Sequence, residues 1–344
     1  MKIGKQSLKF NDVYLNYAAT IVGSLEGEGP LKEYYDEIVY DNYLGCSSFE
    51  QAEMMLQTKC LKKLLAKAKL NDTDIDLLIG GDLINQTAIS NYVGRNFDIP
   101  FLGIYGACST IALGIITSAI AIESNNYDNI IAITSSHNCS AERQFRNPVE
   151  YGGAKGETTT FTVTGAASAL LSRKRSKVMI SGATLGKIID VGFKNQTDMG
   201  RAMAPAAIET LLSHFSDFNL KPSDYDLILT GDLSIFGYEI VKDVLKEKYQ
   251  IFNYNDCGLL IYDNNKQHVF AGGSGCACCG CVTLSYILNE LTMGNLNKVL
   301  ICATGALLNP SMCLQHESIP AIAHAIVLKR CLDWYFYMLF WLVV

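Results

Sequence analysis

Two stretches of this 344-residue chain, LNDTDIDLLIGGDL at residues 70–83 and LKPSDYDLILTGDL at residues 220–233, are copies of one another. They are identical at half of their fourteen positions and lie 150 residues apart. In each copy an apolar run leads into Gly-Asp-Leu, a pattern typical of a buried strand that ends in a turn. The repeat therefore predicts a duplicated chain in which each half places an aspartate, Asp82 or Asp232, at the end of a strand.

A second and weaker repeat, at an offset of 168 residues, follows each aspartate strand. Residues 106–110 and 274–278 each carry a cysteine and open a stretch of small and apolar residues, and a strand-like run comes next. Helices that are apolar nearly all round are expected to be covered on every side. Strands that alternate with helices predict mostly parallel sheets with helices on both faces.

The two repeats together predict two sheets that enclose a central layer of helices. An amphipathic helix is expected before each aspartate strand, at residues 48–69 and 204–215. The polar run at residues 172–176 separates the copies. We therefore predict an N-terminal half at residues 1–175, a C-terminal half at residues 176–330, and an apolar tail at residues 331–344.

Composition excludes several classes of protein. The charged fraction of 18% and the net charge of −6, with no Lys/Arg-rich run, argue against a nucleic-acid partner. The twelve cysteines are too few for a disulfide scaffold of this length, and the N-terminus lacks the apolar core of a signal peptide. We expect reduced thiols. The glycines at residues 272–275 match neither nucleotide-binding motif, so we expect no cofactor.

Several long stretches resemble the thiolase superfamily, and within it the stage V sporulation protein AD family, over residues 5–330. The stretches that carry this resemblance are GGDLINQ (80–86), FLGIYGACST (101–110), TSSHNCSAERQFRNPVEYGG (134–153), FTVTGAASALL (161–171), DMGRAMAPAA (198–207), DYDLILTGDLS (224–234), NDCGLLIYD (255–263), FAGGSGCAC (270–278) and ATGALLNPSM (303–312). The resemblance implies a five-layered αβαβα fold built from two related halves, and a homodimer.

The same resemblance implies a function. The family binds dipicolinic acid, free or as its calcium chelate, and helps to move it into the developing spore. The partners implied are membrane proteins of the stage V sporulation A group. The implied location is the spore or forespore, peripheral to the inner membrane.

Cys108 is the sharpest candidate for a site residue. It follows a predicted strand and begins a predicted helix, where the helix dipole and free N–H groups are expected to lower the pKa of a thiol. Thiolase-like enzymes present their nucleophile in this way. Decarboxylating ketosynthases also carry a histidine and an asparagine or second histidine, where this chain has Asp232 and the turn at Ser274. We therefore expect no enzyme activity. An acyltransferase or condensing enzyme that uses Cys108, and a cysteine that only packs, are the alternatives.

Asp82 and Asp232 are expected to face the pocket beside the central helices. The functional hypothesis is that they help to hold a calcium ion, a hard cation that prefers carboxylate oxygens; no metal site is assigned. The alternative is that each aspartate caps a turn or helix through backbone N–H groups.

The segment at residues 134–153 is rich in polar side chains after a predicted buried strand. Guanidinium groups match planar carboxylates, so Arg143 and Arg146 are candidate ligand-binding residues, and His137 is a third. The alternatives are an interface loop with internal salt bridges for the arginines and a structural hydrogen bond for His137.

A run of four cysteines and the apolar tail are two further features of the sequence. The cysteines at residues 276–281 have spacings that are compatible with a zinc site. They open a helix that is expected to be buried, which favours packing of small residues instead.

The tail at residues 331–344 departs from the family pattern and is too short to span a bilayer. It is an interfacial anchor, an interface segment or the product of a reading-frame change.

Overall fold

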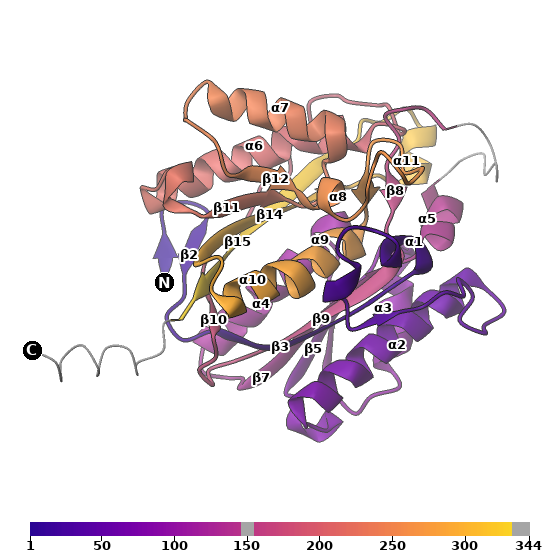
Figure 1. Cartoon of the computed structure of the whole chain (residues 1–344), viewed down its shortest axis with the longest axis vertical. Helices are drawn as coiled ribbons and strands as arrows, with labels where there is room; N and C mark the ends of the chain where they lie inside the picture. The colour runs from indigo at the N-terminus through magenta and orange to yellow at the C-terminus, as the bar shows by residue number, and fades with distance from the viewer. Residues whose placement is uncertain (146–154, 332–344) are drawn as a thin grey trace, which may run out of the picture.

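The computed structural model describes residues 1–145 and 155–331, and its main sheet contains two groups of five strands in equivalent order (Figure 1). The first group runs β6-β5-β7-β9-β3 and the second runs β12-β11-β14-β15-β10. The bounds of the first group are β3 (Tyr14–Val22), β5 (Leu77–Gly81), β6 (Phe101–Gly103), β7 (Asn129–Ser136) and β9 (Gly165–Ser172). Those of the second are β10 (Val178–Thr184), β11 (Leu227–Thr230), β12 (Tyr254–Asp256), β14 (Lys298–Ala306) and β15 (Ala321–Arg330). The duplication predicted from the two repeats is confirmed.

Strand directions differ from the prediction. In each half three neighbouring strands are parallel, and the last two pair antiparallel, as β9 does with both β7 and β3. The same holds for β15 between β14 and β10. The expectation of mostly parallel sheets is therefore wrong, because in the described parts of the chain a long helix packed on the sheet lies between parallel strands and not between β14 and β15 or in residues 137–145 and 155–164 between β7 and β9.

A central layer of helices lies between the two groups of strands (Figure 1). It contains α4 (Thr110–Glu123) from the first half and the continuous run α9 (Cys276–Val282), η6 (Thr283–Ile287) and α10 (Leu288–Met293) from the second. Among the described helices, the run Cys276–Met293 is the one long and apolar enough to cross a membrane, and 67% of it is buried within the protein. It is a core helix, as the sequence predicts.

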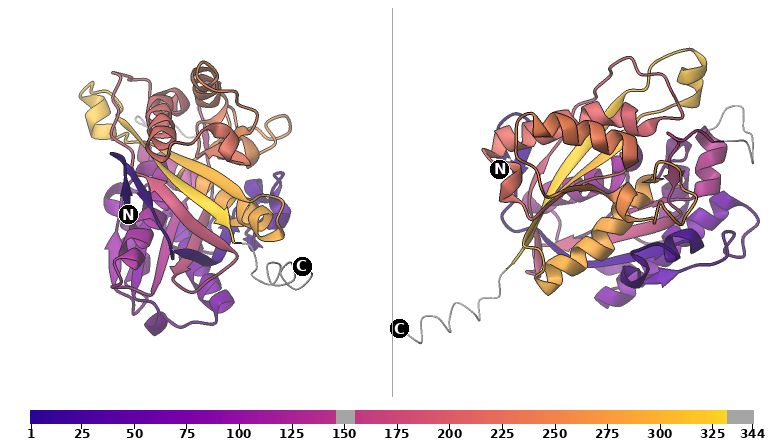
Figure 2. Two further views of the ribbon diagram at one scale, coloured as in Figure 1. Left: turned by 90° about the vertical axis from the view of Figure 1, so that its left-hand side faces the viewer. Right: turned by 45° about the horizontal axis from the view of Figure 1, so that its top comes forward.

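The outer faces are covered by α2 (Phe49–Ala68) and α3 (Ala88–Gly94) on one side and by α6 (Met199–Phe218) and α7 (Ser234–Lys246) on the other (Figures 1 and 2). Helix α2 begins after Ser48, whose side chain accepts a hydrogen bond from the Gln51 N–H. Helix α6 begins five residues before the predicted start, because Asp198 caps it and Pro205 is tolerated inside it. The five layers predicted from the sequence are present.

The two groups of strands are joined at one edge, where β3 pairs with β10 through Leu15 and Val178. The predicted boundary at residues 175 and 176 lies in the loop between β9 and β10. The remaining elements are short: β1 (Lys2–Ile3), β2 (Ser7–Lys9), α1 (Ser24–Gly27), η1 (Lys32–Tyr34), β4 (Glu37–Ile38), η2 (Asp72–Asp74), η3 (Asn85–Thr87), η4 (Ala107–Ser109), α5 (Asn138–Phe145), β8 (Phe161–Thr162), η5 (Pro222–Asp224), α8 (Cys257–Leu260), β13 (Gly273–Ser274) and α11 (Pro310–Leu314).

Close packing of α9 explains its unusual composition. A Cβ atom at Gly280 would lie 2.9 Å from the Cβ of Ala167 on β9. All twelve cysteines of the chain are free, and Cys276, Cys278, Cys279 and Cys281 are buried. Small side chains thus allow the central helix to approach the sheet closely, and the packing predicted for this run is confirmed.

Candidate functional site

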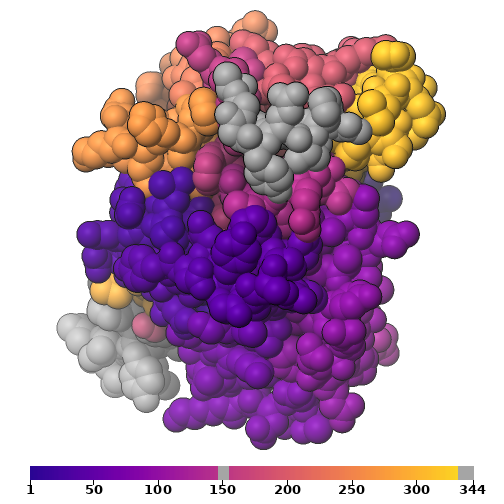
Figure 3. Space-filling view, turned by 90° about the vertical axis from the view of Figure 1, so that its right-hand side faces the viewer, coloured from indigo at the N-terminus to yellow at the C-terminus, as the bar shows by residue number. Residues whose placement is uncertain are grey.

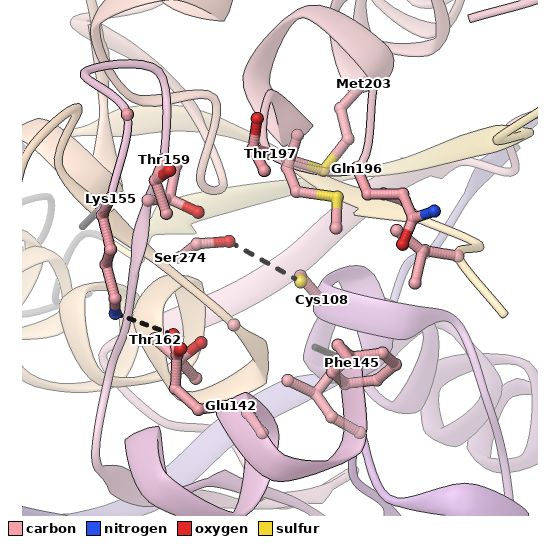
Figure 4. A pocket seen from close by; sticks show the side chains of 18 of the residues that line it. Cys108, Glu142, Phe145, Lys155, Thr159, Thr162, Gln196, Thr197, Met203 and Ser274 are labelled. Carbon is pink, nitrogen blue, oxygen red and sulfur yellow. Dashed lines mark hydrogen bonds and ion pairs between the residues drawn. The ribbon is translucent and has the colours of Figure 1, made fainter. Parts of the chain in front are cut away.

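A cavity of about 350 Å³ lies between the two halves, over the start of the helix that carries Cys108 (Figure 4). Figure 3 shows a face of the molecule on which both halves are visible. Segments of the first half are indigo to magenta, and segments of the second half are orange to yellow. The lining residues are Leu83, Tyr105, Cys108, Ala141, Glu142, Phe145, Lys155, Gly156, Thr159, Thr160, Thr162, Gln196, Thr197, Met199, Met203, Ser274, Gly275, Ala306 and Leu308. The cavity is therefore built from both copies of the repeat.

A tight turn between β6 and α4 presents Cys108 to the cavity. Ala107 has a positive φ of 49°, which is uncommon for a residue with a side chain. The turn is held by hydrogen bonds from Ser109 Oγ to the Gly106 carbonyl, at 2.6 Å, and from Thr110 Oγ1 to the Ala107 carbonyl, at 2.6 Å. These bonds fix the direction in which the thiol points.

Gly305 on β14 allows this turn to reach the second half of the molecule. A Cβ atom at Gly305 would lie 2.4 Å from the Gly106 carbonyl oxygen and 3.3 Å from the Cys108 nitrogen. We expect Gly305→Ala to lower the free energy of unfolding by about 1–3 kcal/mol, because the backbone must move to relieve the overlap. Urea denaturation checks this. Gly156→Ala is the control, since a Cβ there has no neighbour within 4 Å, and equal stability of the two variants would contradict the expectation.

Cys108 and Ser274 lie at the floor of the cavity, and the buried Asp232 lies beneath Ser274. Ser274 Oγ donates to Asp232 Oδ2 at 2.6 Å and lies 3.9 Å from Cys108 Sγ. Asp232 also accepts from Thr304 Oγ1 at 2.6 Å and from the Gly275 N–H at 3.1 Å. The pairing of β8 with β13 sets Thr162 beside Ser274. Three of the predicted site residues are thus one hydrogen-bonded group.

Electrostatics at this floor keep the thiol protonated. Burial raises the pKa of Cys108 well above its ordinary value, and the Asp232 carboxylate raises it further. Burial also raises the pKa of Asp232, although hydrogen bonds from Ser274 and Thr304 lower it. The expectation that the helix start lowers the pKa of Cys108 is therefore wrong. Burial and the adjacent carboxylate, which belongs to the other half of the chain, outweigh the helix dipole.

Asp82 lies at the position equivalent to Asp232, and neither aspartate is among the described residues that line the cavity. Its carboxylate accepts hydrogen bonds from the N–H groups of Ile84, at 2.9 Å, and Ser90, at 2.8 Å. These hydrogen bonds are the ones expected if Asp82 caps a turn or helix through backbone N–H groups. Burial raises the pKa of Asp82, and Asp82 in turn raises the pKa of its buried neighbour Glu53.

The predicted residues on and before α5 do not meet at the cavity. His137 is buried, with Nε2 2.9 Å from the Asn42 carbonyl oxygen, and burial lowers its pKa. Arg143 is exposed and pairs with Glu50. Arg146 lies outside the described residues. Arg143 therefore forms an internal salt bridge, as the alternative for the arginines expects. His137 makes a structural hydrogen bond, as its own alternative expects.

The charged pair that does line the cavity, Lys155 and Glu142, was not predicted from the sequence. Lys155 Nζ is 3.0 Å from Glu142 Oε1, and each side chain is 16% exposed (Figure 4). A sequence signal was available, because Lys155 and three consecutive threonines, residues 158–160, directly precede the β8 strand. Thr158 Oγ1 then donates to the Thr197 carbonyl at 3.1 Å, which joins two walls of the cavity.

In the part of the chain that the structure describes, neither a histidine nor a metal-binding cluster lies beside Cys108 at the cavity. None of the five histidines of the chain is among the lining residues. Over residues 1–145 and 155–331, no three His, Cys, Asp or Glu side chains are grouped so as to hold a metal ion. The thiols of the Cys276 run point to separate partners, such as the carbonyls of Ala107 for Cys276 and Gly231 for Cys278.

Comparison with known proteins agrees with the fold and identifies the family. A model of the Stage V sporulation protein AD (SpoVAD) family matches residues 4–329. Stage V sporulation protein AD of Bacillus subtilis (strain 168) is 47% identical over 330 residues, which cover 95% of this chain and 97% of that protein.

Solved structures show the same architecture at low identity. Cerulenin-bound OleA of Xanthomonas campestris is 14% identical, with a TM-score of 0.61 over 93% of this chain and 98% of that one. The 3-oxoacyl-[acyl-carrier-protein] synthase III of Aquifex aeolicus VF5 is 14% identical, with a TM-score of 0.54 over 95% and 100%. The fold is thiolase-like, and the chain belongs to the stage V sporulation protein AD family, whose role is in sporulation.

Proposed function

We propose that the protein binds dipicolinic acid, free or as its calcium chelate, in the cavity over Cys108, and that it supports uptake of this compound into the developing spore without acting as an enzyme. The observation that carries the proposal is the floor of the cavity, where Ser274 donates a hydrogen bond to the buried Asp232 carboxylate and no histidine is among the described lining residues. The sporulation family supports the choice of ligand.

The dimensions and chemistry of the cavity suit a small planar acid. A volume of about 350 Å³ is near the lower end of the range for ligand sites. Apolar side chains such as Met199, Met203 and Phe145 can pack against a ring, while hydroxyl groups and the Lys155 ammonium can bind carboxylate oxygens.

The electrostatics argue against catalysis. A nucleophilic cysteine reacts as the thiolate and needs a base nearby. Here burial and Asp232 raise the pKa of Cys108, and no histidine lines the cavity. The thiol is therefore a poor nucleophile at neutral pH.

Calorimetric titration with dipicolinate tests the proposal. We expect saturable binding by the wild type, and we expect Cys108→Ala to retain affinity within about threefold, since loss of a weakly hydrogen-bonding thiol costs little. Absence of binding to the wild type would contradict the proposal.

An acyltransferase that uses Cys108 is the second candidate, because the thiol is partly exposed to the cavity at the start of a helix. Incubation with an acyl thioester and mass spectrometry separates the two functions. Covalent labelling of Cys108 followed by turnover would favour the enzyme, whereas dipicolinate binding without acyl transfer favours the binding protein.

The involvement of calcium is tested by repeating the titration with calcium present, on the wild type and Asp82→Asn. The hydrogen bonds of Asp82 to backbone N–H groups lead us to expect equal calcium affinity in both. A loss of calcium affinity in Asp82→Asn would assign this aspartate to a cation site.

We further propose a homodimer that acts with membrane proteins of the stage V sporulation A group at the inner membrane of the forespore. The edge strand β6 supports the dimer, since its Leu102 side chain is 41% exposed and nearby Tyr105 is 45% exposed. The tail beyond Cys331 lies outside the described residues. Light scattering on the full chain measures the oligomeric state.

A further inference from the structure

We infer that Lys155 binds a carboxylate group of the ligand and that Glu142 positions the ammonium for this purpose; the inference rests on the proposed function and names the residue that recognises the ligand's charge. Among the described residues that line the cavity, Lys155 is the one with a cationic side chain. Among these described residues, the Lys155 ammonium is therefore the cationic group that an anionic ligand can contact.

The ammonium of Lys155 is held in a defined place. It is 3.0 Å from Glu142 Oε1, and both side chains are 16% exposed. It also lies 5.7 Å from the centre of the Phe161 ring and 5.8 Å from that of Phe270. Contacts with a carboxylate and two ring faces restrict a flexible side chain, which reduces the entropy lost on binding.

The ammonium retains capacity for a ligand. A lysine ammonium has three N–H donors, and the Glu142 contact uses one of them. At this degree of burial the charge is less screened than on the surface, so a hydrogen bond to a carboxylate is strengthened. Lys155 can therefore pair with Glu142 and with a ligand carboxylate together.

The charge distribution also orients the ligand. In Figure 4, Lys155 and Thr159 lie on one wall, Gln196 and Met203 on another, and Ser274 lies between them. The buried Asp232 carboxylate beneath Ser274 repels an anion from the floor. A carboxylate is thus favoured at Lys155.

Arg143, the cation predicted from the sequence, does not compete for this role. Its guanidinium pairs with Glu50, and Arg143 is not a lining residue. Successive residues of α5 therefore have different roles: Glu142 faces the cavity and Arg143 faces away from it.

The test compares Lys155→Met with Lys59→Met. The control also removes one positive charge from an ion pair, since Lys59 is 2.8 Å from Glu37 on the outer surface of α2, and Lys63 still neutralises that glutamate. The probes are dipicolinate, pyridine-2-carboxylate and the uncharged pyridine-2-carboxamide, all titrated calorimetrically. Thermal unfolding curves show that each variant is folded.

We expect Lys155→Met to bind dipicolinate about tenfold or more weakly than the wild type, as for loss of a charge-assisted hydrogen bond, and Lys59→Met to bind like the wild type. The wild type should prefer pyridine-2-carboxylate to the carboxamide, and its affinity should fall between about 0.05 M and about 0.5 M salt. Lys155→Met should lose both the preference and the salt dependence, which a merely structural role would leave unchanged.

Two results would overturn the inference while the proposed function stands: equal dipicolinate affinity in Lys155→Met and Lys59→Met, or a wild type that binds dipicolinate yet does not distinguish the carboxylate from the carboxamide. The second result is measured on the wild type alone, so it tests the inference about Lys155 even if Lys155→Met does not fold. A wild type that binds none of the three probes would overturn the proposed function and the inference together.

Discussion

Asp232→Asn is expected to raise the rate at which iodoacetamide alkylates Cys108 by about tenfold or more near pH 8, which corresponds to a fall of about one unit in the pKa of the thiol. The Asp232 carboxylate raises that pKa in the wild type, in addition to burial. An asparagine removes the charge and keeps an oxygen that can accept from the Gly275 N–H. A lower pKa gives more thiolate at a fixed pH, and the thiolate is the species that reacts.

Peptide mass spectrometry assigns the label among the twelve cysteines, and Cys108→Ala confirms the assignment. Asp256→Asn is the matched control, because Asp256 is also buried in the second half but its carboxylate accepts hydrogen bonds from the N–H groups of Leu233 and Ser234 and from Thr230 Oγ1, and not from Cys108 or Ser274. An alkylation rate at Cys108 that is the same in the wild type and in a folded Asp232→Asn protein would contradict our explanation of the inactive thiol.

The contribution of Glu53 to stability should fall as the pH rises from about 4.5 to about 8, because this buried glutamate takes up a proton on folding. Burial, and then the nearby Asp82 carboxylate, raise the pKa of Glu53 from 4.5 to about 8. In that window the folded state binds more protons than the unfolded state. The contribution of Glu53 to the free energy of unfolding therefore decreases by up to about 1.4 kcal/mol per pH unit.

Glu53→Gln should flatten this dependence. Gln is an uncharged isostere of the protonated acid, and it can keep the hydrogen bonds to Ser135 and Ser140. Urea denaturation at a series of pH values measures the effect. In the control Glu37→Gln, the slope in this window should persist, because hydrogen bonds from Lys59 and Lys63 lower the pKa of Glu37 and its contribution is lost only in acid. Parallel pH profiles for the wild type and Glu53→Gln would contradict the assignment.

The arrangement of layers was predictable because the chain repeats itself. The repeats at residues 70–83 and 220–233 became β5 and β11, each in the second position of its group of strands. Apolar patterning also identified the two central helices. Strand direction was not predictable in the same way, since the described part of the connection from β7 to β9, residues 137–145 and 155–164, contains no long helix that covers the sheet.

The site was predicted less completely than the fold. Cys108, Ser274 and Asp232 were found because each lies at the end of a repeated element. The role of Arg143 depended on which side of a short helix faces the cavity, and sequence spacing does not determine that. The pKa of Cys108 is raised first by burial and then by a carboxylate 124 positions further along the chain. Only the folded arrangement shows which of two opposing electrostatic effects is larger.

A crystal structure of the protein with dipicolinate tests most directly that the cavity over Cys108 is a ligand-binding site without catalytic function. We predict the pyridine ring between the apolar side chains of Met199 and Phe145, a carboxylate oxygen within hydrogen-bonding distance of Lys155 Nζ, and an unmodified Cys108 thiol. Dipicolinate bound elsewhere on the chain with this cavity empty, or an adduct on Cys108, would contradict the account.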